Sequence, residues 1–416
     1  MCYIFPMVWD AIVIGAGPAG LAAGYAASKS GAKVLILEKN PKAGKKLFIT
    51  GKGRCNVTNA CDEREFLSNV VRNPHFLHAA YRAFSPADMM EFLTSRGVEV
   101  VVERGKRVFP KSYRAYEVTD ALVNANKTNG VSFHFQEEVL GIEDSPAGFT
   151  VHTNRATHAG SNVVICTGGL AYPSTGSTGD GYRFAKNFGH EISPLSTGLT
   201  GLRVNPPFPQ EMVNLHLKNV ELHAKTPKKR YSEFGELTFR EDYLDGPIAL
   251  TLSSYLALLP PQEVELRLDL KPALSEEKLH GRIQRDIESN PRSSLSSLLG
   301  GLLPHDLIPF VLLLVSRSGT EIVSTLSSSF RRELAHFLKN VPFEYLGNNP
   351  YPRAIITVGG VSTKEVDAST MESKFIPGLY FGGEVLDLDA LTGGFNIQIA
   401  LSTGFLAGQS IAETLN

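Results

Sequence analysis

The first forty residues alternate between short apolar runs and an alanine-rich segment. Ala11 to Ile14 is a continuous apolar run of the kind that forms a buried parallel strand, and Lys33 to Leu37 contains a second one. Between them, Leu21 to Ser30 is rich in alanine and is predicted to be a helix. The pattern therefore predicts a strand–helix–strand unit at the start of the chain.

Helical spacing continues further along, over 74–84 and again after Ser85, which we expect to cap a helix that starts at Pro86 and ends by Gly97. Another helix is predicted from Ala115 to Lys127. Four short segments are apolar or alternate with period two, namely 133–135, 138–143, 149–153 and 163–166. These four are predicted to form a small β-meander that returns to the main sheet.

The character of the chain changes between residues 195 and 349. Short strand-like pieces separated by proline-rich turns occupy 199–270, and a region rich in Leu, Ser, Lys and Glu with helical spacing occupies 275–340. This block is predicted to be an inserted β-barrel-like subdomain with a small helical bundle. Its basic run, Lys225 to Arg230, is expected to be a solvated hairpin tip rather than a nucleic-acid site.

Composition narrows the class of protein. The 416 residues carry a formal net charge of −1, which gives no general attraction to nucleic acid or to an anionic membrane. The four cysteines show neither CxxC nor metal-ligand spacing, so free thiols in a reducing cytoplasm and no metal site are expected. The longest apolar run, 307–315, is too short to span a bilayer. We expect a cytoplasmic protein with a small-molecule substrate and neither nucleic acid nor membrane as partner.

The turn after the first strand has the sequence Gly15-Ala16-Gly17-Pro18-Ala19-Gly20. In this fingerprint the first glycine permits the tight turn, the second lets a pyrophosphate approach the backbone, and the third lets helix and strand pack closely. Glu38 ends the second strand, 18 residues beyond Gly20, where an acid accepts the ribose hydroxyls and repels a 2′-phosphate. The motif predicts binding of FAD or NAD rather than NADP.

A long loop, 40–59, follows Glu38 and carries five cations without an acid. A solvated surface is one interpretation. Its position next to the ribose-binding strand, and its three glycines, favour a second cradle for pyrophosphate and flavin.

The stretch Thr50-Gly51-Lys52-Gly53-Arg54-Cys55-Asn56-Val57-Thr58-Asn59 resembles the signature of the YhiN/BaiN-type bacterial flavoproteins. Further likenesses lie in the segments 163–181, 354–361, 378–387 and 392–398. The resemblance implies an α/β fold: a Rossmann-like, three-layer ββα FAD-binding domain, split into 1–194 and 350–416. The insert between them, 195–349, would be β-rich to residue 272 and helical from 273.

The resemblance and the glycine motif together predict the cofactor site. A backbone group at Val139 would bind adenine, Asp180 would either cap a helix or face the cofactor, and the helix that opens near Asn396 would stabilise negative charge on the reduced flavin. The residues predicted to bind FAD are Gly15, Gly17, Pro18, Ala19, Gly20, Glu38, Lys39, Lys45, Lys46, Gly51, Arg54, Cys55, Asn56, Thr58, Val139, Thr167, Gly168, Gly169, Asp180, Gly383, Glu384, Gly394, Phe395, Asn396 and Ile397.

No general acid or base stands out in the sequence. Cys55 and Cys61 do not form a CxxxxC pair, so a thiol relay beside the flavin is not expected, and Cys55 is interpreted as a packing residue. The leading hypothesis is an FAD-dependent oxidoreductase that transfers hydride at flavin N5, with NAD(P)H as a transient donor or O₂ as acceptor, acting as an amine oxidase or an enone-type reductase. The alternatives are a flavin-containing tRNA-modifying or nucleic-acid-binding protein and a non-catalytic flavin redox sensor.

Overall fold

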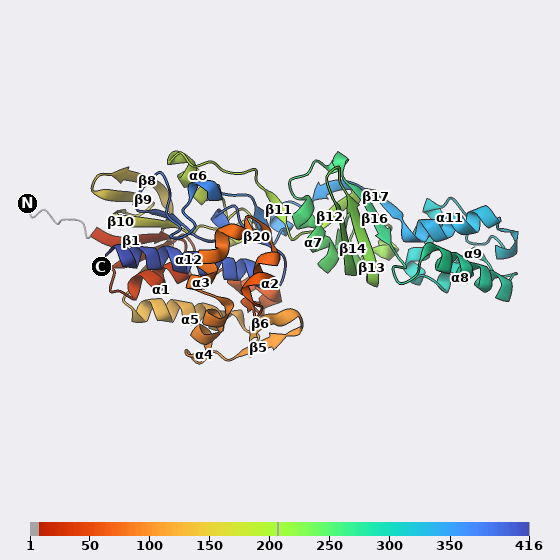
Figure 1. Ribbon diagram of the computed structural model, residues 1–416, viewed down its shortest axis with the longest axis horizontal. Coiled ribbons are helices and arrows are strands. Elements are labelled where there is room, and N and C mark those ends of the chain that lie inside the picture. Colours follow the sequence, from red (N-terminus) through yellow and green to blue (C-terminus); the bar gives the residue numbers. More distant parts are fainter. Residues whose placement is uncertain (1–7, 206–207, 416) are drawn as a thin grey trace, which may run out of the picture. The chain divides into compact units, whose positions relative to one another are not determined.

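The chain divides into two units in the computed structural model, which describes residues 8–205 and 208–415 (Figure 1). Unit 1 comprises the described residues up to 197 and from 351 onwards, and unit 2 comprises those between 198 and 350. The expected divisions lay after residues 194 and 349. Within the described residues, no helix combines the length and the apolar character needed to cross a bilayer.

A seven-stranded sheet forms the centre of unit 1. Its order is β7-β2-β1-β10-β9-β8, and β19 also pairs with β10. The strands are β1 (Val8–Ile14), β2 (Val34–Glu38), β7 (Ser132–Phe135), β8 (Val139–Ser145), β9 (Gly148–Thr153), β10 (Thr157–Ile165) and β19 (Leu379–Phe381). Ile14 lies beside both Leu37 and Ile165, so the carboxyl ends of β2, β1 and β10 meet at one edge. In an open α/β sheet this edge is where ligands bind.

The segment 133–135 does not join the predicted meander. It forms β7, which pairs in parallel with β2 on the side of the sheet away from β8 and β9. The preceding helix α5 (Ala115–Thr128) packs on α1 and so provides the crossover that a parallel strand requires. Only β8, β9 and β10 form the expected antiparallel meander.

Two helices from opposite ends of the chain pack together in unit 1. They are α1 (Pro18–Ser28) and α12 (Phe395–Thr414), which lie side by side in Figure 1. A Cβ added at Gly404 or Gly408 would lie 2.1 Å from the carbonyl oxygen of Ala19 or Ala23, respectively. Because both glycines lack a side chain, the two helix backbones come into contact. The C-terminal segment is thereby held against the glycine turn.

The remaining elements of unit 1 surround this core. The helices are α2 (Glu63–Ser68), α3 (His78–Ala83), α4 (Pro86–Thr94) and α6 (Asp180–Asn187), and the short strands are β3 (Thr58–Asn59), β4 (Val70–Arg72), β5 (Val100–Glu103), β6 (Arg107–Pro110), β11 (Ser196–Gly198), β18 (Ile356–Val358) and β20 (Asp389–Ala390). Ser85 caps α4 through a reciprocal capping box with Asp88, as the sequence indicates.

Unit 2 contains a closed antiparallel barrel with strand order β12-β15-β14-β13-β16-β17. The strands are β12 (Leu202–Asn205), β13 (His216–Lys225), β14 (Arg230–Phe239), β15 (Tyr243–Asp245), β16 (Glu265–Asp269) and β17 (Val341–Asn348). Its helices are α7 (Pro247–Leu256), which packs on β14, and α8 (Glu276–Ser289), α9 (Leu295–Gly300), α10 (Ile308–Leu314) and α11 (Ser328–Lys339), which come between β16 and β17. The predicted barrel is confirmed, and Lys225 pairs with Arg230 where β13 turns into β14, so the basic run is the tip of a hairpin.

Candidate functional site

A large cavity opens at the carboxyl ends of β1, β2 and β10, and all the residues that line it belong to unit 1. The empty space in the cavity and at its open mouth together amounts to about 1320 Å³. The lining comes from five stretches of chain, within 14–19, 37–50, 137–139, 166–184 and 355–400.

The glycine turn forms one wall of the cavity. Gly15 has φ +102°, and a Cβ there would lie 2.6 Å from the carbonyl oxygen of Cys166 on the neighbouring strand end. A Cβ on Gly20 would lie 1.8 Å from the carbonyl oxygen of Gly15. Gly17 is the N-cap of α1 and lines the cavity. A Cβ added at Gly17 would have no protein atom within 4 Å. The free N–H groups of the first turn of α1, which starts at Pro18, therefore offer a binding site for an anion.

Glu38 lies at the end of β2 with its carboxylate fixed. One oxygen accepts a hydrogen bond from the backbone N–H of Ala16 at 2.8 Å, and the other accepts from the backbone and side-chain nitrogens of Asn40 at 2.8 and 2.7 Å. A carboxylate has about four acceptor positions, so Glu38 retains capacity for a hydroxyl. This residue lines the cavity, as predicted for a ribose-binding acid.

Three lysines of the basic region line the cavity, and each is engaged with another segment. Lys39 forms an ion pair with Asp180 at 2.6 Å, Lys45 donates to the carbonyl of Ser174 at 2.7 Å, and Lys46 pairs with Glu384 at 2.5 Å. These contacts join the β2 end to the walls contributed by 174–180 and 384. The lysines therefore hold the walls of the cavity together, and two of the three are neutralised by acids of the same lining.

The second half of the basic loop does not line the cavity, contrary to its predicted role as a cradle. Gly51, Cys55, Asn56 and Thr58 lie behind the wall, and Arg54 stacks over the rings of Phe109 and Tyr113 at 4.9 and 5.6 Å. The motif therefore acts mainly as a packing element. The part of the loop that reaches the cavity stops at Thr50.

Burial makes Cys55 an inert thiol. Its side chain is inaccessible, and desolvation raises the pKa of Cys55 to about 12 although a hydrogen bond with Thr50 lowers it. The residue has φ +57°, a left-handed conformation that is uncommon for a non-glycine residue. These features agree with a packing role.

The end of β10 supplies small residues to the cavity. Thr167 and Gly168 line it, and the hydroxyl of Thr167 is buried without a hydrogen-bond partner among the described residues. Such an orphaned group indicates a ligand contact. Gly169 lies outside the lining because it packs against Thr357, whose hydroxyl would be 2.3 Å from an added Cβ. Asp180 is the first residue of α6, but Gly179 occupies the N-cap and no side chain caps this helix. The Asp180 carboxylate instead accepts from Lys39 and Thr178, and the residue lines the cavity, so of its two alternatives the capping role is wrong.

The C-terminal segment closes the other side. Gly383, Glu384, Asn396 and Ile397 line the cavity, whereas Gly394 packs on the backbone of Thr58, with an added Cβ 2.4 Å from its carbonyl oxygen. Phe395 also lies outside the lining, with its ring 5.3 Å from that of Phe66.

The side chain of Asn396, one of the residues predicted to bind FAD, is engaged with the protein. Its oxygen accepts from the N–H of Ala390 at 2.9 Å and its nitrogen donates to the carbonyl of the same residue at 2.7 Å. The amide instead fixes the turn that precedes α12. The contribution of this helix to the cavity is therefore its N-terminal backbone.

Residues that the sequence did not indicate complete the site. Val139 lines the cavity as predicted, and so do Asn40, Ser177 and Ile356, which lie in recognised segments (40–59, 163–181 and 354–361) but were not named as FAD-binding residues. Glu137 also lines the cavity and lies in no recognised segment, so it comes there through the tertiary fold.

An FAD molecule fits these features. A helix N-terminus for a pyrophosphate lines the cavity together with a fixed acid for a ribose, the N-terminus of α12 also lines it, and the buried hydroxyl of Thr167 lacks a partner among the described residues. The fold and site thus define a Rossmann-type flavoprotein oxidoreductase.

The chain belongs to the HI0933-like protein Rossmann domain family, whose sequence pattern matches residues 9–410. This confirms the resemblance to the YhiN/BaiN-like proteins. The chain is 31% identical to the ribosomal RNA dihydrouridine synthase of Escherichia coli, over 97% of this chain and 98% of that protein. It is 29% identical to the 3-dehydro-bile acid delta(4,6)-reductase of Clostridium scindens, over 96% and 98%, and 29% identical to the ribosomal RNA dihydrouridine synthase of Haemophilus influenzae, over 97% and 98%.

Solved structures share the fold at low sequence identity. The 3-ketosteroid-delta4-(5alpha)-dehydrogenase of Rhodococcus jostii superposes with a TM-score of 0.50 at 14% identity, over 99% of this chain and 98% of that chain. The FrdA protein of E. coli quinol fumarate reductase gives a TM-score of 0.51 at 16% identity, over 98% and 70%. At these identities the similarity concerns the fold alone.

Proposed function

We propose that this protein is an FAD-dependent reductase that saturates a carbon–carbon double bond conjugated with a carbonyl group, and that its substrate is a uridine in ribosomal RNA. The observation that carries the proposal is the cavity of unit 1, with its glycine turn and fixed acid, in a chain whose near-full-length relatives include two ribosomal RNA dihydrouridine synthases and a bile acid reductase.

The two named reactions share their chemistry. Dihydrouridine arises when two hydrogens add to the ring double bond of uracil, which is conjugated with a carbonyl, and a 3-dehydro bile acid presents double bonds conjugated with its ketone. One hydrogen arrives as hydride on the carbon remote from the carbonyl, and the other arrives as a proton. Bound FAD, once reduced by two electrons from the donor, would supply the hydride from N5 and return to its oxidised form, and the proton would come from solvent.

Residues of unit 1 would hold the cofactor. The first turn of α1 would bind the pyrophosphate, Glu38 the adenosine ribose, and the backbone at Val139 the adenine. The N-terminus of α12, at Asn396 and Ile397, would stabilise negative charge on the isoalloxazine, an effect of about 0.3–1 kcal/mol at an exposed site and more when partly buried. Thr167 would donate its unused hydroxyl proton.

A reductase needs a donor that reduces the flavin, and we take NADH or NADPH as that donor. The sequence contains no second glycine fingerprint for a stably bound nicotinamide nucleotide. NADH or NADPH would accordingly bind only transiently.

A small conjugated ketone is the second candidate substrate. The Clostridium relative favours it, and so does the near balance of 41 basic and 42 acidic residues, which provides no general attraction to RNA phosphates. This alternative corresponds to the sequence prediction of a small-molecule substrate without a nucleic-acid partner.

The test uses the purified FAD-loaded protein under anaerobic conditions with NADPH or NADH. One arm supplies ribosomal RNA from a strain in which the gene is deleted, and the other supplies a conjugated steroid ketone; reactions without reductant are the controls. The proposal predicts dihydrouridine at a defined position of the RNA, detected by mass spectrometry. Turnover of the ketone alone would select the second candidate, and reduction of FAD without turnover of either substrate would contradict the proposed function and favour a redox sensor.

A further inference from the structure

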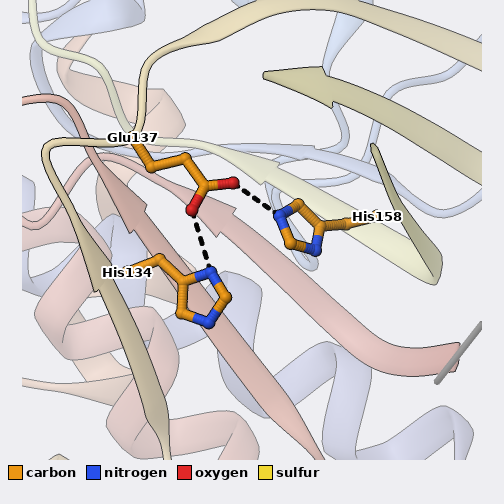
Figure 2. Close-up of side chains that lie close together, drawn as sticks. All are labelled: His134, Glu137 and His158. Carbon is orange, nitrogen blue, oxygen red and sulfur yellow. Dashed lines mark hydrogen bonds and ion pairs between the residues drawn. The ribbon is translucent and has the colours of Figure 1, made fainter. Parts of the chain in front are cut away.

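Three side chains with metal-binding chemistry converge beside the wall of the cavity that contains Glu137 and Val139. Figure 2 shows His134, Glu137 and His158 with both imidazole rings turned toward one carboxylate. Nδ1 of His134 lies 3.0 Å from one carboxylate oxygen of Glu137, and Nε2 of His158 lies 2.7 Å from the other. The three potential ligand atoms all lie within 4.8 Å of one another.

The backbone of unit 1 fixes this arrangement. His134 is on β7 and is in register with Leu37 of β2, and His158 is on β10, in register with Val151 of β9. Glu137 lies in the short turn between β7 and β8, where its N–H donates to the carbonyl of Glu38 at 3.0 Å. Two of the three side chains therefore come from strands of the central sheet, and the third comes from a short turn that a backbone hydrogen bond to the end of β2 holds in place.

The cluster is enclosed on one side and open on the other. The side chain of Glu137 is 5% exposed and that of His158 11%, whereas that of His134 is 40% exposed. Thr153 supports the carboxylate by donating its hydroxyl to the oxygen that faces His158, at 2.8 Å. A fixed carboxylate with an outer hydrogen bond and an open face toward solvent has the organisation of a metal site, in which outer partners orient the ligands.

We propose that His134, Glu137 and His158 bind a divalent transition-metal ion of the zinc type. Two imidazole nitrogens and one carboxylate oxygen are the donors that Zn²⁺ and its neighbours prefer, whereas Mg²⁺ and Ca²⁺ prefer oxygen ligands. Metal–ligand bonds of about 2.0–2.2 Å bring the ligand atoms within about 4 Å of one another. A small rotation of the exposed His134 side chain meets this requirement, and water completes the coordination on the open face.

A second group of side chains has the same kinds of metal ligand but is less suited to binding a metal ion. Glu221, His223 and Asp269 also gather within bonding range of one ion among the described residues. Asp269, however, is already neutralised by the ammonium of Lys339 at 2.6 Å and accepts the N–H of Lys271. A cation there would compete with that lysine.

The prediction that no metal is bound rested on the spacing of the cysteines. The ligands found here are histidines and a glutamate, and His158 is separated from His134-x-x-Glu137 by two strands. The inference concerns a structural ion, away from the glycine turn and α12, and it stands whether or not the proposed reaction is correct.

The test measures Zn²⁺ binding to the full-length, untagged protein after treatment with a chelator. Competition with a chromophoric chelator should give one Zn²⁺ per chain with a Kd of about 1 μM or lower, and Co²⁺ should give the visible absorption bands of a low-coordinate site. His134→Ala, His158→Ala and Glu137→Gln should each weaken binding at least about tenfold. His134 is the most exposed of the three, so its replacement keeps the fold intact.

Two matched controls identify the site. His336→Ala removes an exposed histidine that has one carboxylate partner, Glu276 at 2.9 Å, and His223→Ala removes the histidine of the competing group. Both should bind Zn²⁺ as the unmodified chain does. The proposal is overturned if no saturable binding occurs, if His134→Ala binds normally, or if either control loses the ion to the same degree.

Discussion

Two glycines of the phosphate turn have different environments, so a methyl group should affect them differently. At Gly20 the added Cβ would lie 1.8 Å from the carbonyl oxygen of Gly15, whereas at Gly17 it would meet no protein atom within 4 Å. We predict that Gly20→Ala lowers the melting temperature of the FAD-free protein. Gly17→Ala should leave that temperature unchanged and weaken FAD binding at least about tenfold, because the methyl enters the space where the pyrophosphate would lie. Thermal melting and FAD titration separate the two effects, and equal loss of stability in both variants would contradict the assignment.

The thiol of Cys55 should be chemically silent. Because burial raises its pKa to about 12, it stays protonated at pH 8, where an ordinary cysteine with a pKa of about 8.5 is partly thiolate. We predict that iodoacetamide does not label Cys55 in the native protein at pH 8, by peptide mass mapping, and labels it after unfolding. Cys55→Ser should retain FAD and activity. Loss of activity with FAD retained would show that the thiol takes part in the reaction.

Single residues were predictable where chemistry and local geometry coincide. Glu38 ends a strand whose position relative to Gly20 is fixed by one βαβ unit, so its place at the cavity follows from sequence spacing. Arg54 and Asn396 follow motifs equally closely, yet Arg54 stacks on Phe109 and Asn396 binds the backbone of Ala390. Phe109 is distant from Arg54 in sequence, and although Ala390 is only six residues from Asn396, the motif does not show that the Asn396 side chain turns back to it.

A buried ion pair joins β4 to β20. Arg72 contacts both oxygens of Asp389 at 2.9 Å, and the Asp389 side chain is 1% exposed. Burial raises the pKa of Asp389, and Arg72 opposes that rise. Arg72→Met should therefore leave an uncompensated buried carboxylate and cost about 3–5 kcal/mol of stability at pH 8.

The stability lost in Arg72→Met should be larger at high pH than at low pH. The pKa of Asp389 is higher in the folded protein than in the unfolded chain. The folded protein therefore loses stability as the pH rises and the carboxyl ionises, and it regains that stability at lower pH, where the carboxyl is protonated. The pKa of this carboxyl should rise further without Arg72, so the deficit of Arg72→Met should shrink between pH 8 and pH 5. Melting temperatures at both values measure this. Arg64→Met, at an exposed position on α2, should change stability by only about 0.5 kcal/mol, and a deficit that grows toward pH 5 would refute the account.

The contact between α1 and α12 requires glycine on α12. An added Cβ at Gly408 would lie 2.1 Å from the carbonyl oxygen of Ala23, so Gly408→Ala should force the helices apart at a cost of about 1–3 kcal/mol and release FAD more readily. Gly281→Ala on α8 is the matched control, because its Cβ would come no closer than 3.6 Å to a flexible arginine. That variant should gain about 0.5–1 kcal/mol. A stable Gly408→Ala protein with normal FAD content would contradict the role of this packing.

Helices and strands were predictable from the sequence where a local signal defines them. They were not predictable where pairing with a distant strand defines them. The cap and proline at Ser85-Pro86 give the start of α4, and apolar runs give β1, β2 and the end of β10. The partner of β7 is set by the α5 crossover, and the short alternation over 133–135 cannot distinguish a parallel edge strand from part of a meander. Barrel closure likewise depends on β12 pairing with β17, which lies well over a hundred residues away.

At the scale of the molecule, the cavity is built entirely from unit 1 although unit 2 interrupts that unit in sequence. Four segments were expected to converge: the glycine turn with Glu38, 51–59, 167–181 and 383–396. Residues of the first, third and fourth line the cavity, whereas the described residues of 51–59 do not. The convergence was predictable because strand ends of a parallel sheet share an edge. The substrate was not predictable, because no acid–base motif marks it.

The most direct test of the account is the cofactor content of the purified protein. Denaturation of the isolated chain should release close to one FAD per polypeptide, identified by its absorption spectrum and by mass spectrometry, and the Gly17→Ala variant should release much less at unchanged apoprotein stability. A colourless protein that takes up no FAD on titration, or one that binds a different nucleotide in this cavity, would contradict the account.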